Sequence, residues 1–149
     1  MSTGNPVLDQ FIKENGLVDM LGDIAEFHNK FEIPRAVTPQ LLPVEDMGFR
    51  VSFLFEEMQE LVDGFEKDDV EEIFDALIDL IYVALGTAWM MGLPFGEGWS
   101  RVHTANMLKV RAKHAGESKR GSALDVVKPD GWKAPDLSDL CTEIVIPKK

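Results

Sequence analysis

Two short stretches of the sequence place carboxylates beside apolar residues, an arrangement that suits metal-assisted chemistry. FEEMQELVDG contains Glu56, Glu57 and Glu60, and EEIFDALIDLIYVALG contains Glu72, Asp75 and Asp79. In the second stretch Asp79 interrupts an otherwise apolar run from Leu77 to Leu85, and such a run predicts a buried helix. Because burying an unpaired charge is very costly, Asp79 should have a partner that offsets its desolvation.

The spacing of these acids places them on one stripe of each of two helices. At about 100° per residue, Glu56, Glu57 and Glu60 share one arc, and Glu72, Asp75 and Asp79 share another. A tight turn between the two helices predicts an antiparallel hairpin in which the stripes could face each other. Carboxylates this close repel one another unless protons, basic groups or a cation intervene, and all-oxygen ligation selects Mg²⁺ or Mn²⁺. The sequence therefore predicts a metal ion as the partner of Asp79, and a solvated acidic face is the alternative.

A further stretch, VHTANMLKV, carries polar groups on what resembles a packing side. Asn106 and Lys109 fall on the same side of the predicted helix as Trp99. A hydrogen-bond donor and a cation there would suit phosphate oxygens, whereas a lysine whose head reaches water would be purely structural. Downstream, KPDGW supplies Lys128 as a weaker candidate of the same kind.

Helical periodicity dominates the chain and predicts an all-α fold, a four-helix bundle with a long C-terminal arm. We expect helices over about 17–31, 44–65 and 69–91 and a fourth that starts near Pro94 and carries Val110. The proline-containing segment 34–43 is an extended linker. We expect a single domain over 1–149, with an N-terminal extension at 1–16 and a loop and arm at 112–149.

Composition excludes several classes of function. The net charge of −11 disfavours nucleic-acid binding through a basic surface, but it does not disfavour metal ions. Cys141 is the one cysteine, so an intrachain disulfide and a cysteine-rich zinc site are excluded. Neither a signal sequence nor an uninterrupted apolar run of membrane-spanning length is visible, so we expect a cytoplasmic protein without a membrane partner.

Four blocks in this order, EEMQEL, DALIDLIYVALGTAWMMGLP, VHTANMLKV and KPDGWKAPDL, resemble the MazG-like, all-α nucleoside triphosphate pyrophosphohydrolases. The similarity covers roughly Ile24 to Leu137 and is greatest to the branch with dUTPase-like and phage-encoded members, often labelled phosphoribosyl-ATP pyrophosphohydrolase-like. The resemblance implies cleavage of a (deoxy)nucleoside triphosphate between the α and β phosphates, which yields a monophosphate and pyrophosphate. It also implies a homo-oligomer, a homodimer or a homotetramer.

The resemblance assigns roles to particular residues. It implies Mg²⁺ or Mn²⁺ bound by Glu57, Glu60, Asp75 and Asp79, with Glu56 or Glu57 orienting or deprotonating the attacking water. The family has a Glu three residues before the final Asp, where this chain has Ala76, so Asp75 or Glu72 replaces it. Phosphates would bind Asn106, Lys109, Lys128 and Arg50, and the base would lie near Phe27, His28 and Tyr82.

The sequence leaves the substrate open, with a deoxynucleotide such as dGTP or dUTP expected. The sequence also leaves open the base, the sugar, the number of metal ions and a bacterial or phage origin. In the phage case the location would be the host cytoplasm. A non-enzymatic helical interaction module is the main alternative function, although it does not explain Asp79. A di-iron carboxylate bundle would need Glu-x-x-His pairs, and none of the three histidines provides one.

Overall fold

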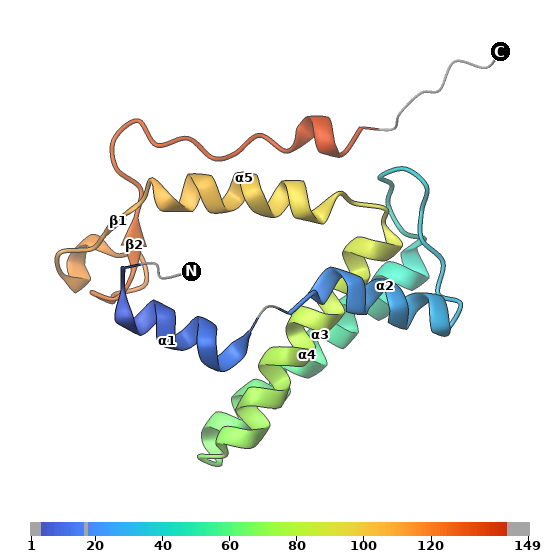
Figure 1. Cartoon of the computed structure of the whole chain (residues 1–149), viewed down its shortest axis with the longest axis horizontal. Coiled ribbons are helices and arrows are strands. Elements are labelled where there is room, and N and C mark those ends of the chain that lie inside the picture. The colour runs from blue at the N-terminus through green and yellow to red at the C-terminus, as the bar shows by residue number, and fades with distance from the viewer. Residues whose placement is uncertain (1–3, 17, 143–149) are drawn as a thin grey trace. The chain divides into compact units, whose positions relative to one another are not determined.

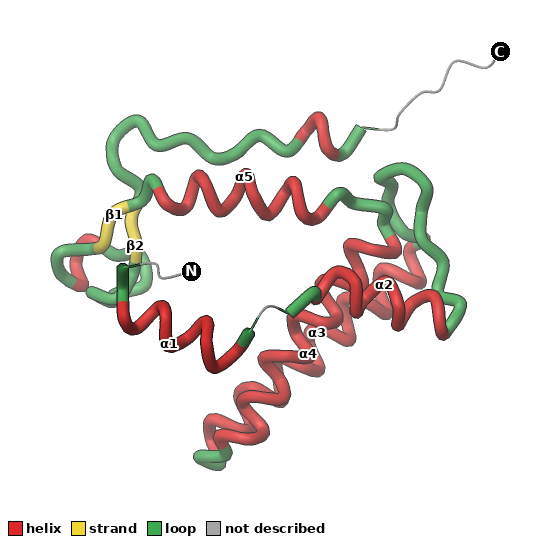
Figure 2. Tube along the Cα trace, viewed as in Figure 1, coloured by secondary structure: helices red, strands yellow, loops and turns green. Residues whose placement is uncertain are grey.

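The computed structural model describes residues 4–16 and 18–142, and these residues are predominantly helical (Figure 1, Figure 2). The α-helices are α1 (Pro6–Asn15), α2 (Met20–Lys30), α3 (Val44–Glu66), α4 (Val70–Met90) and α5 (Phe95–Met107). Two short strands, β1 (Val110–Arg111) and β2 (Val126–Val127), pair antiparallel, and two 3₁₀ turns, η1 (Ala115–Glu117) and η2 (Ser138–Leu140), complete the elements. The all-α class is confirmed.

The chain divides into two compact units. One comprises the residues up to Pro34 together with Ser52–Trp89, and the other comprises Arg35–Val51 together with the residues from Met90 onward. The first unit contains α1, α2 and most of α3 and α4, and the second contains α5, both strands and the C-terminal arm. Each unit is described separately below.

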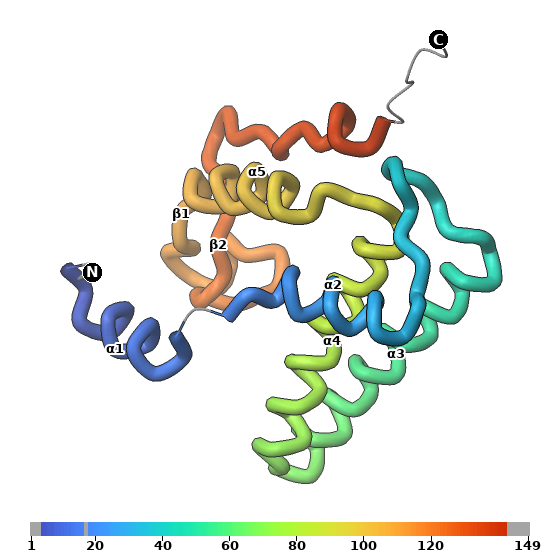
Figure 3. Tube along the Cα trace, turned by 45° about the vertical axis from the view of Figure 1, so that its right-hand side comes forward, coloured from blue at the N-terminus to red at the C-terminus, as the bar shows by residue number. Residues whose placement is uncertain are grey.

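In the first unit, α3 and α4 form an antiparallel hairpin, and the two helices run side by side in both views (Figure 1, Figure 3). Asp69 caps α4, because its Oδ1 accepts the backbone N–H groups of Glu71 at 3.0 Å and Glu72 at 3.1 Å. Gly64 lets the helices approach closely at the turn. A Cβ at that position would lie 3.0 Å from the backbone nitrogen of Ile73. The sequence therefore builds the predicted hairpin through a capping aspartate and a glycine contact.

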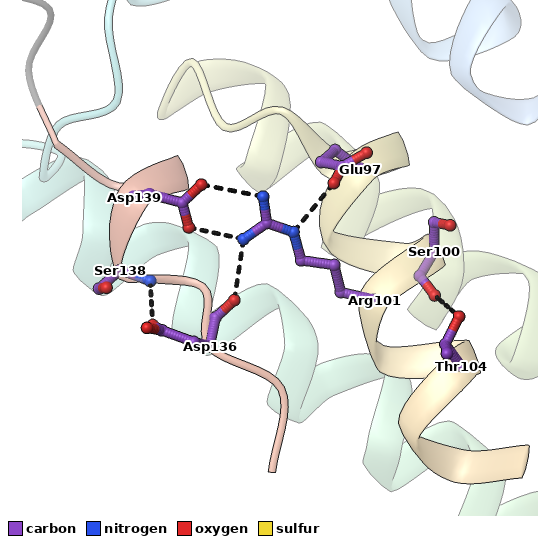
Figure 4. Close-up of polar contacts among 7 residues, drawn as sticks. All are labelled: Glu97, Ser100, Arg101, Thr104, Asp136, Ser138 and Asp139. Carbon is purple, nitrogen blue, oxygen red and sulfur yellow. Dashed lines mark hydrogen bonds and ion pairs between the residues drawn. The ribbon is translucent and has the colours of Figure 1, made fainter. Parts of the chain in front are cut away.

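In the second unit, the C-terminal arm runs along α5 and is attached to it at two places. Trp132 donates its indole N–H to the carbonyl oxygen of Ala105 at 2.8 Å. Arg101 donates to the Asp139 carboxylate with two nitrogens, to the Asp136 carbonyl oxygen at 2.9 Å and to Glu97 Oε1 at 2.9 Å (Figure 4). This bidentate, charge-assisted arrangement fixes the position of η2 on α5.

The structure corrects several expected boundaries. The segment 1–16 is more than an extension, because it contains α1, which begins after the N-cap Asn5 and ends at Gly16 with φ of 68°. The next helix begins at Met20, and Leu17 lies outside the described residues. The fourth predicted helix ends at Met107, so Val110 belongs to β1 and Lys109 is not helical. Two-residue strands are too short for alternation to predict them.

The α4 segment around Asp79 is buried only in part: Ala76, Val83 and Leu85 are buried, but other residues of the run are not. Asp79 is half-buried, and its neighbours Leu77 and Ile78 are 45% and 46% exposed. On the facing helix, Phe55 is 70% exposed. The apolar pattern identified a packing face, but the described residues of the same unit leave part of it exposed. The length and composition of α4 would also permit a membrane span, although the core helix of a soluble protein has the same properties.

Candidate active site

The hairpin of the first unit brings the predicted carboxylates of both helices together around Glu57. The Glu57 side chain is 5% exposed, whereas Glu56, Glu60 and Asp75 are exposed and Asp79 is half-buried. Its atom Oε2 is buried and has no hydrogen-bond partner among the described residues. A buried carboxylate oxygen without a donor is costly, and it marks the point on the hairpin where a partner is required.

Carboxylates from both helices act electrostatically on Glu57. Burial raises the pKa of Glu57 most, followed by the negative charges of Asp79, Glu60, Glu56 and Asp75. These charges come from both helices, so acidic side chains of both stripes lie within electrostatic reach of Glu57. The pKa of Glu57 is raised because desolvation and four like charges all disfavour its ionised form.

Asp75 and Glu72, the two acids expected to replace the family glutamate, have different surroundings. Ala76 is fully buried, so the position aligned with that glutamate has no room for a longer side chain. Glu72 is engaged by Lys67, whose Nζ lies 2.9 Å from Oε1 and 3.1 Å from Oε2. Asp75, in contrast, is one of the charges that act on Glu57. Asp75 therefore belongs to the convergent carboxylates, and Glu72 forms a separate ion pair.

The donor set suits a hard divalent cation in type but is not assembled as a coordination sphere. Every candidate ligand is a carboxylate oxygen, the donor that Mg²⁺ and Mn²⁺ prefer, and Glu57 Oε2 lacks another partner. Across residues 4–16 and 18–142, no group of three or more His, Cys, Asp or Glu side chains is arranged to hold a metal ion. The chemistry of the side chains fits the ion, and the metal assignments stay predictions.

The three residues proposed for the base lie in one aromatic cluster. The Phe27 ring meets Tyr82 edge-on at 5.3 Å and His28 at 5.5 Å between centroids, and His28 lies 5.9 Å from the ring of Trp89. The His28 ring is 2% exposed, and its Nδ1 lies 2.9 Å from the carbonyl oxygen of Ile24. Since a carbonyl only accepts, Nδ1 donates, and Nε2 is buried with no hydrogen-bond partner among the described residues.

A cavity of about 380 Å³ opens between α2 and α4 in the same unit. Its volume is in the range of small-molecule sites, and its lining is mostly apolar. Sequence reasoning identified Tyr82 but none of the other lining residues, because apolar positions of two separate helices give no local signal that they enclose a space. The lining residues are Val18, Met20, Asp23, Ile24, Phe74, Ile78, Ile81, Tyr82 and Leu85.

The four predicted phosphate-binding residues belong to the second unit. Arg50 is buried, and burial lowers the pKa of its guanidinium group. Asn106 is exposed, and its backbone carbonyl accepts the N–H of Lys109 at 3.0 Å. Lys109 and Lys128 both lie over the ring of Trp132, with Nζ 5.3 Å and 4.6 Å from its centroid. The structure thus brings the two lysines together, although the helical pattern used to select Lys109 ends before it.

The raised pKa of Glu57 predicts a pH effect on stability. Above its ordinary value of 4.5, the folded protein binds the Glu57 proton more tightly than the unfolded chain does. The Glu57 contribution therefore destabilises the fold increasingly as the pH rises from 4.5 through the raised pKa. Urea unfolding of wild type and Glu57→Gln, measured without divalent ions between about pH 4 and 7, should show a stability difference that grows with pH. A pH-independent difference would contradict the electrostatic picture of the cluster.

The helical hairpin with carboxylates on both helices belongs to an all-α pyrophosphohydrolase of the MazG-like superfamily, hydrolases that act on acid anhydrides, as a family-model match shows. The sequence matches the family model described as phosphoribosyl-ATP pyrophosphohydrolase over residues 24–106, more than half of the chain, and the protein belongs to that family. Such enzymes typically depend on a divalent metal ion. No curated protein matches the chain. Helix α1 and the C-terminal arm lie outside the matched region.

Proposed function

We propose that the protein is a metal-dependent (deoxy)nucleoside triphosphate pyrophosphohydrolase that releases a monophosphate and pyrophosphate. The convergence of carboxylates from α3 and α4 on the buried, unpartnered Glu57 carries this proposal. Mg²⁺ or Mn²⁺ would be held by Glu57, Glu60, Asp75 and Asp79. Asp75 is preferred to Glu72, because Lys67 already neutralises Glu72.

Other residues of the chain would activate the attacking water and bind the phosphates. When bound, the metal ion neutralises phosphate charge and makes a water molecule more acidic. Glu56 is exposed beside the buried Glu57, so it is the carboxylate available to orient and deprotonate the attacking water. The cationic groups of Lys109, Lys128 and Arg50, with the amide of Asn106, would bind the phosphate oxygens of the substrate and neutralise their charge.

The nucleobase would be recognised by the aromatic cluster of Phe27, His28 and Tyr82. Edge-on and tilted rings offer the apolar faces on which a base packs, and the adjacent cavity is large enough for a small ligand. The unpartnered Nε2 of His28 would accept a hydrogen bond from the base. Both dGTP and dUTP carry a ring N–H, so this feature is compatible with the two expected substrates without choosing between them.

The exposed apolar side chains of α3 and α4 favour a homo-oligomer. Phe55, Phe65 and Phe74 are 70%, 73% and 64% exposed, and they lie near half-exposed aliphatic residues on the same hairpin. Soluble monomers rarely expose large contiguous apolar patches. We propose a homodimer or homotetramer in which a second copy covers these side chains, and a cytoplasmic location, as expected for a nucleotide hydrolase.

A substrate panel tests the proposed function. The purified chain is incubated with Mg²⁺ or Mn²⁺ and each of the common deoxynucleoside and ribonucleoside triphosphates, dUTP and phosphoribosyl-ATP, and the products are identified by chromatography. We expect a monophosphate and pyrophosphate in equal amounts from at least one of them, and none from Glu57→Gln prepared in parallel. Release of inorganic phosphate and a diphosphate would contradict the cleavage position. No turnover, together with no change of Tm on adding metal, would favour the helical interaction module.

A further inference from the structure

Two lysines oppose each other at the end of the small antiparallel ribbon of the second unit. Val110 of β1 pairs with Val127 of β2. Lys109 directly precedes Val110, and Lys128 directly follows Val127. The two lysines therefore occupy the next opposed position of the register. Like charges directly opposite each other on paired strands are destabilising. A group that attracts both ammonium groups would offset this repulsion.

The Trp132 ring is that group. The Nζ atoms of Lys109 and Lys128 lie 5.3 Å and 4.6 Å from its centroid, both within the distance at which a cation is attracted to an indole face. The ring thus offsets part of the repulsion between the lysines. It does not neutralise them, because it carries no net charge.

The ring itself is fixed in place by two backbone interactions. Its Nε1–H donates to the Ala105 carbonyl oxygen in the last turn of α5 at 2.8 Å. The backbone N–H of Trp132 donates to the carbonyl oxygen of Pro129 at 3.1 Å, which closes a turn. Gly131 has φ of 77° in that turn, a conformation that glycine adopts readily. The sequence PDGW therefore returns the indole to the strands that carry the lysines.

Among the described residues, no carboxylate forms an ion pair with either lysine. The ion pairs of the described residues engage Lys67, Arg101, His114 and Arg120, but not Lys109 or Lys128. The pair thus offers two uncompensated ammonium groups held by one rigid ring.

We propose that Trp132 is the positioning residue of a polyphosphate-binding site, in which Lys109 and Lys128 bind neighbouring phosphate groups. Lysine binds phosphate as a compact point charge on a flexible stem, and a shared ring reduces the freedom lost on binding. The identity of the ligand as the substrate's triphosphate chain rests on the proposed function, while the positioning of the lysines rests on the second unit alone. Trp132 touches the lysines and acts through them.

Titration calorimetry with inorganic tripolyphosphate, in EDTA and without divalent ions, tests the site apart from turnover. Wild type should bind, and Lys109→Met and Lys128→Met should each weaken binding by about tenfold, the loss of one charge-assisted contact. Trp132→Leu should weaken binding by about as much, while Trp132→Phe, which keeps a ring, should retain most of it. Lys133→Met changes the same charge in the adjoining arm and should bind as wild type does.

Three results would overturn the proposal: lysine variants that bind normally, a Trp132→Leu variant that binds normally, or a Trp132→Leu effect that simply adds to that of Lys109→Met. Circular dichroism identifies any variant that fails to fold. If Trp132→Leu fails to fold, Trp132→Phe and Lys133→Met are compared instead. Loss of tripolyphosphate binding in a folded Trp132→Phe variant, but not in Lys133→Met, would contradict a role for the ring face.

Kinetics provide a second readout that a purely structural role would not give. With a substrate identified from the panel, Trp132→Leu should raise KM by about tenfold and change kcat little, as expected when uniform binding is lost. Tripolyphosphate binding that depends on Trp132 in a chain that hydrolyses no nucleotide would overturn the proposed function and leave this inference standing. Turnover with a normal KM in Trp132→Leu would overturn this inference and leave the proposed function standing.

Discussion

Glu57→Gln should lower kcat by at least about a hundredfold, since even the outer partners of a metal site commonly contribute 10–100-fold. The same change should raise the Tm of the metal-free protein, because it removes a negative charge that burial and four nearby acids disfavour. Function and stability move in opposite directions because Glu57 is a buried carboxylate among four other acids, with Oε2 unpartnered. Glutamine keeps its shape and removes its charge.

The matched control for this prediction is Glu66→Gln, which removes one negative charge from an exposed position near the end of the same helix. It should leave both kcat and the Tm in EDTA nearly unchanged. A Glu57→Gln protein that loses stability in EDTA would mean that the carboxylate is stabilised by its surroundings, contrary to its raised pKa. Full activity in Glu57→Gln would remove this residue from the site.

Asp79→Asn should abolish metal-dependent turnover while leaving the helical content intact. Asp79 is the first of the charges that raise the pKa of Glu57, so the two carboxylates lie close across the hairpin. Asparagine preserves the shape and weakens ligation of a hard cation, which prefers charged oxygen donors. In wild type, saturating Mg²⁺ at about 100 times its Kd should stabilise the fold by about 2.7 kcal/mol, and this gain should be absent in the variant.

Asp68→Asn provides the control for Asp79→Asn. Asp68 lies in the exposed turn between α3 and α4 with φ of 55°, a conformation that asparagine adopts readily. This variant should keep its turnover and its stabilisation by Mg²⁺. Measured by thermal denaturation with and without the ion, equal stabilisation of wild type and Asp79→Asn would place the metal site elsewhere in the chain.

Much of the fold was predictable because residues that start and stop helices stand in the sequence beside the helical segments. The periodicity of apolar residues, with Pro34 and the GLP at 92–94 as breaks, predicted α2 to α5 to within a few residues at most of their ends. Helix α1 was missed, although Asn5, Pro6 and Gly16 are typical start and stop residues. It is short and none of its described residues is buried, so its apolar pattern was weak beside those of the longer helices.

The candidate site was predictable only where one element or one turn determines it. Opposed carboxylates followed from the 3.6-residue period and from a turn too short for any arrangement but a hairpin. The pairing of Glu72 with Lys67 did not follow, because a side chain five residues away reaches its partner only through the geometry of the turn. The exposure of Phe55 and Ile78 could not be predicted either, because a sequence identifies an apolar face but not the surface that covers it.

The two attachments of the C-terminal arm make it a segment whose local unfolding proceeds in stages. The indole of Trp132 attaches the arm to α5 at one point. Arg101 attaches it at a second point, through Asp136 and Asp139. Release of either attachment leaves only a short tether, and reclosing a short loop costs little entropy. Fraying from one end is therefore readily reversed, and the arm leaves α5 for long only when both attachments open together.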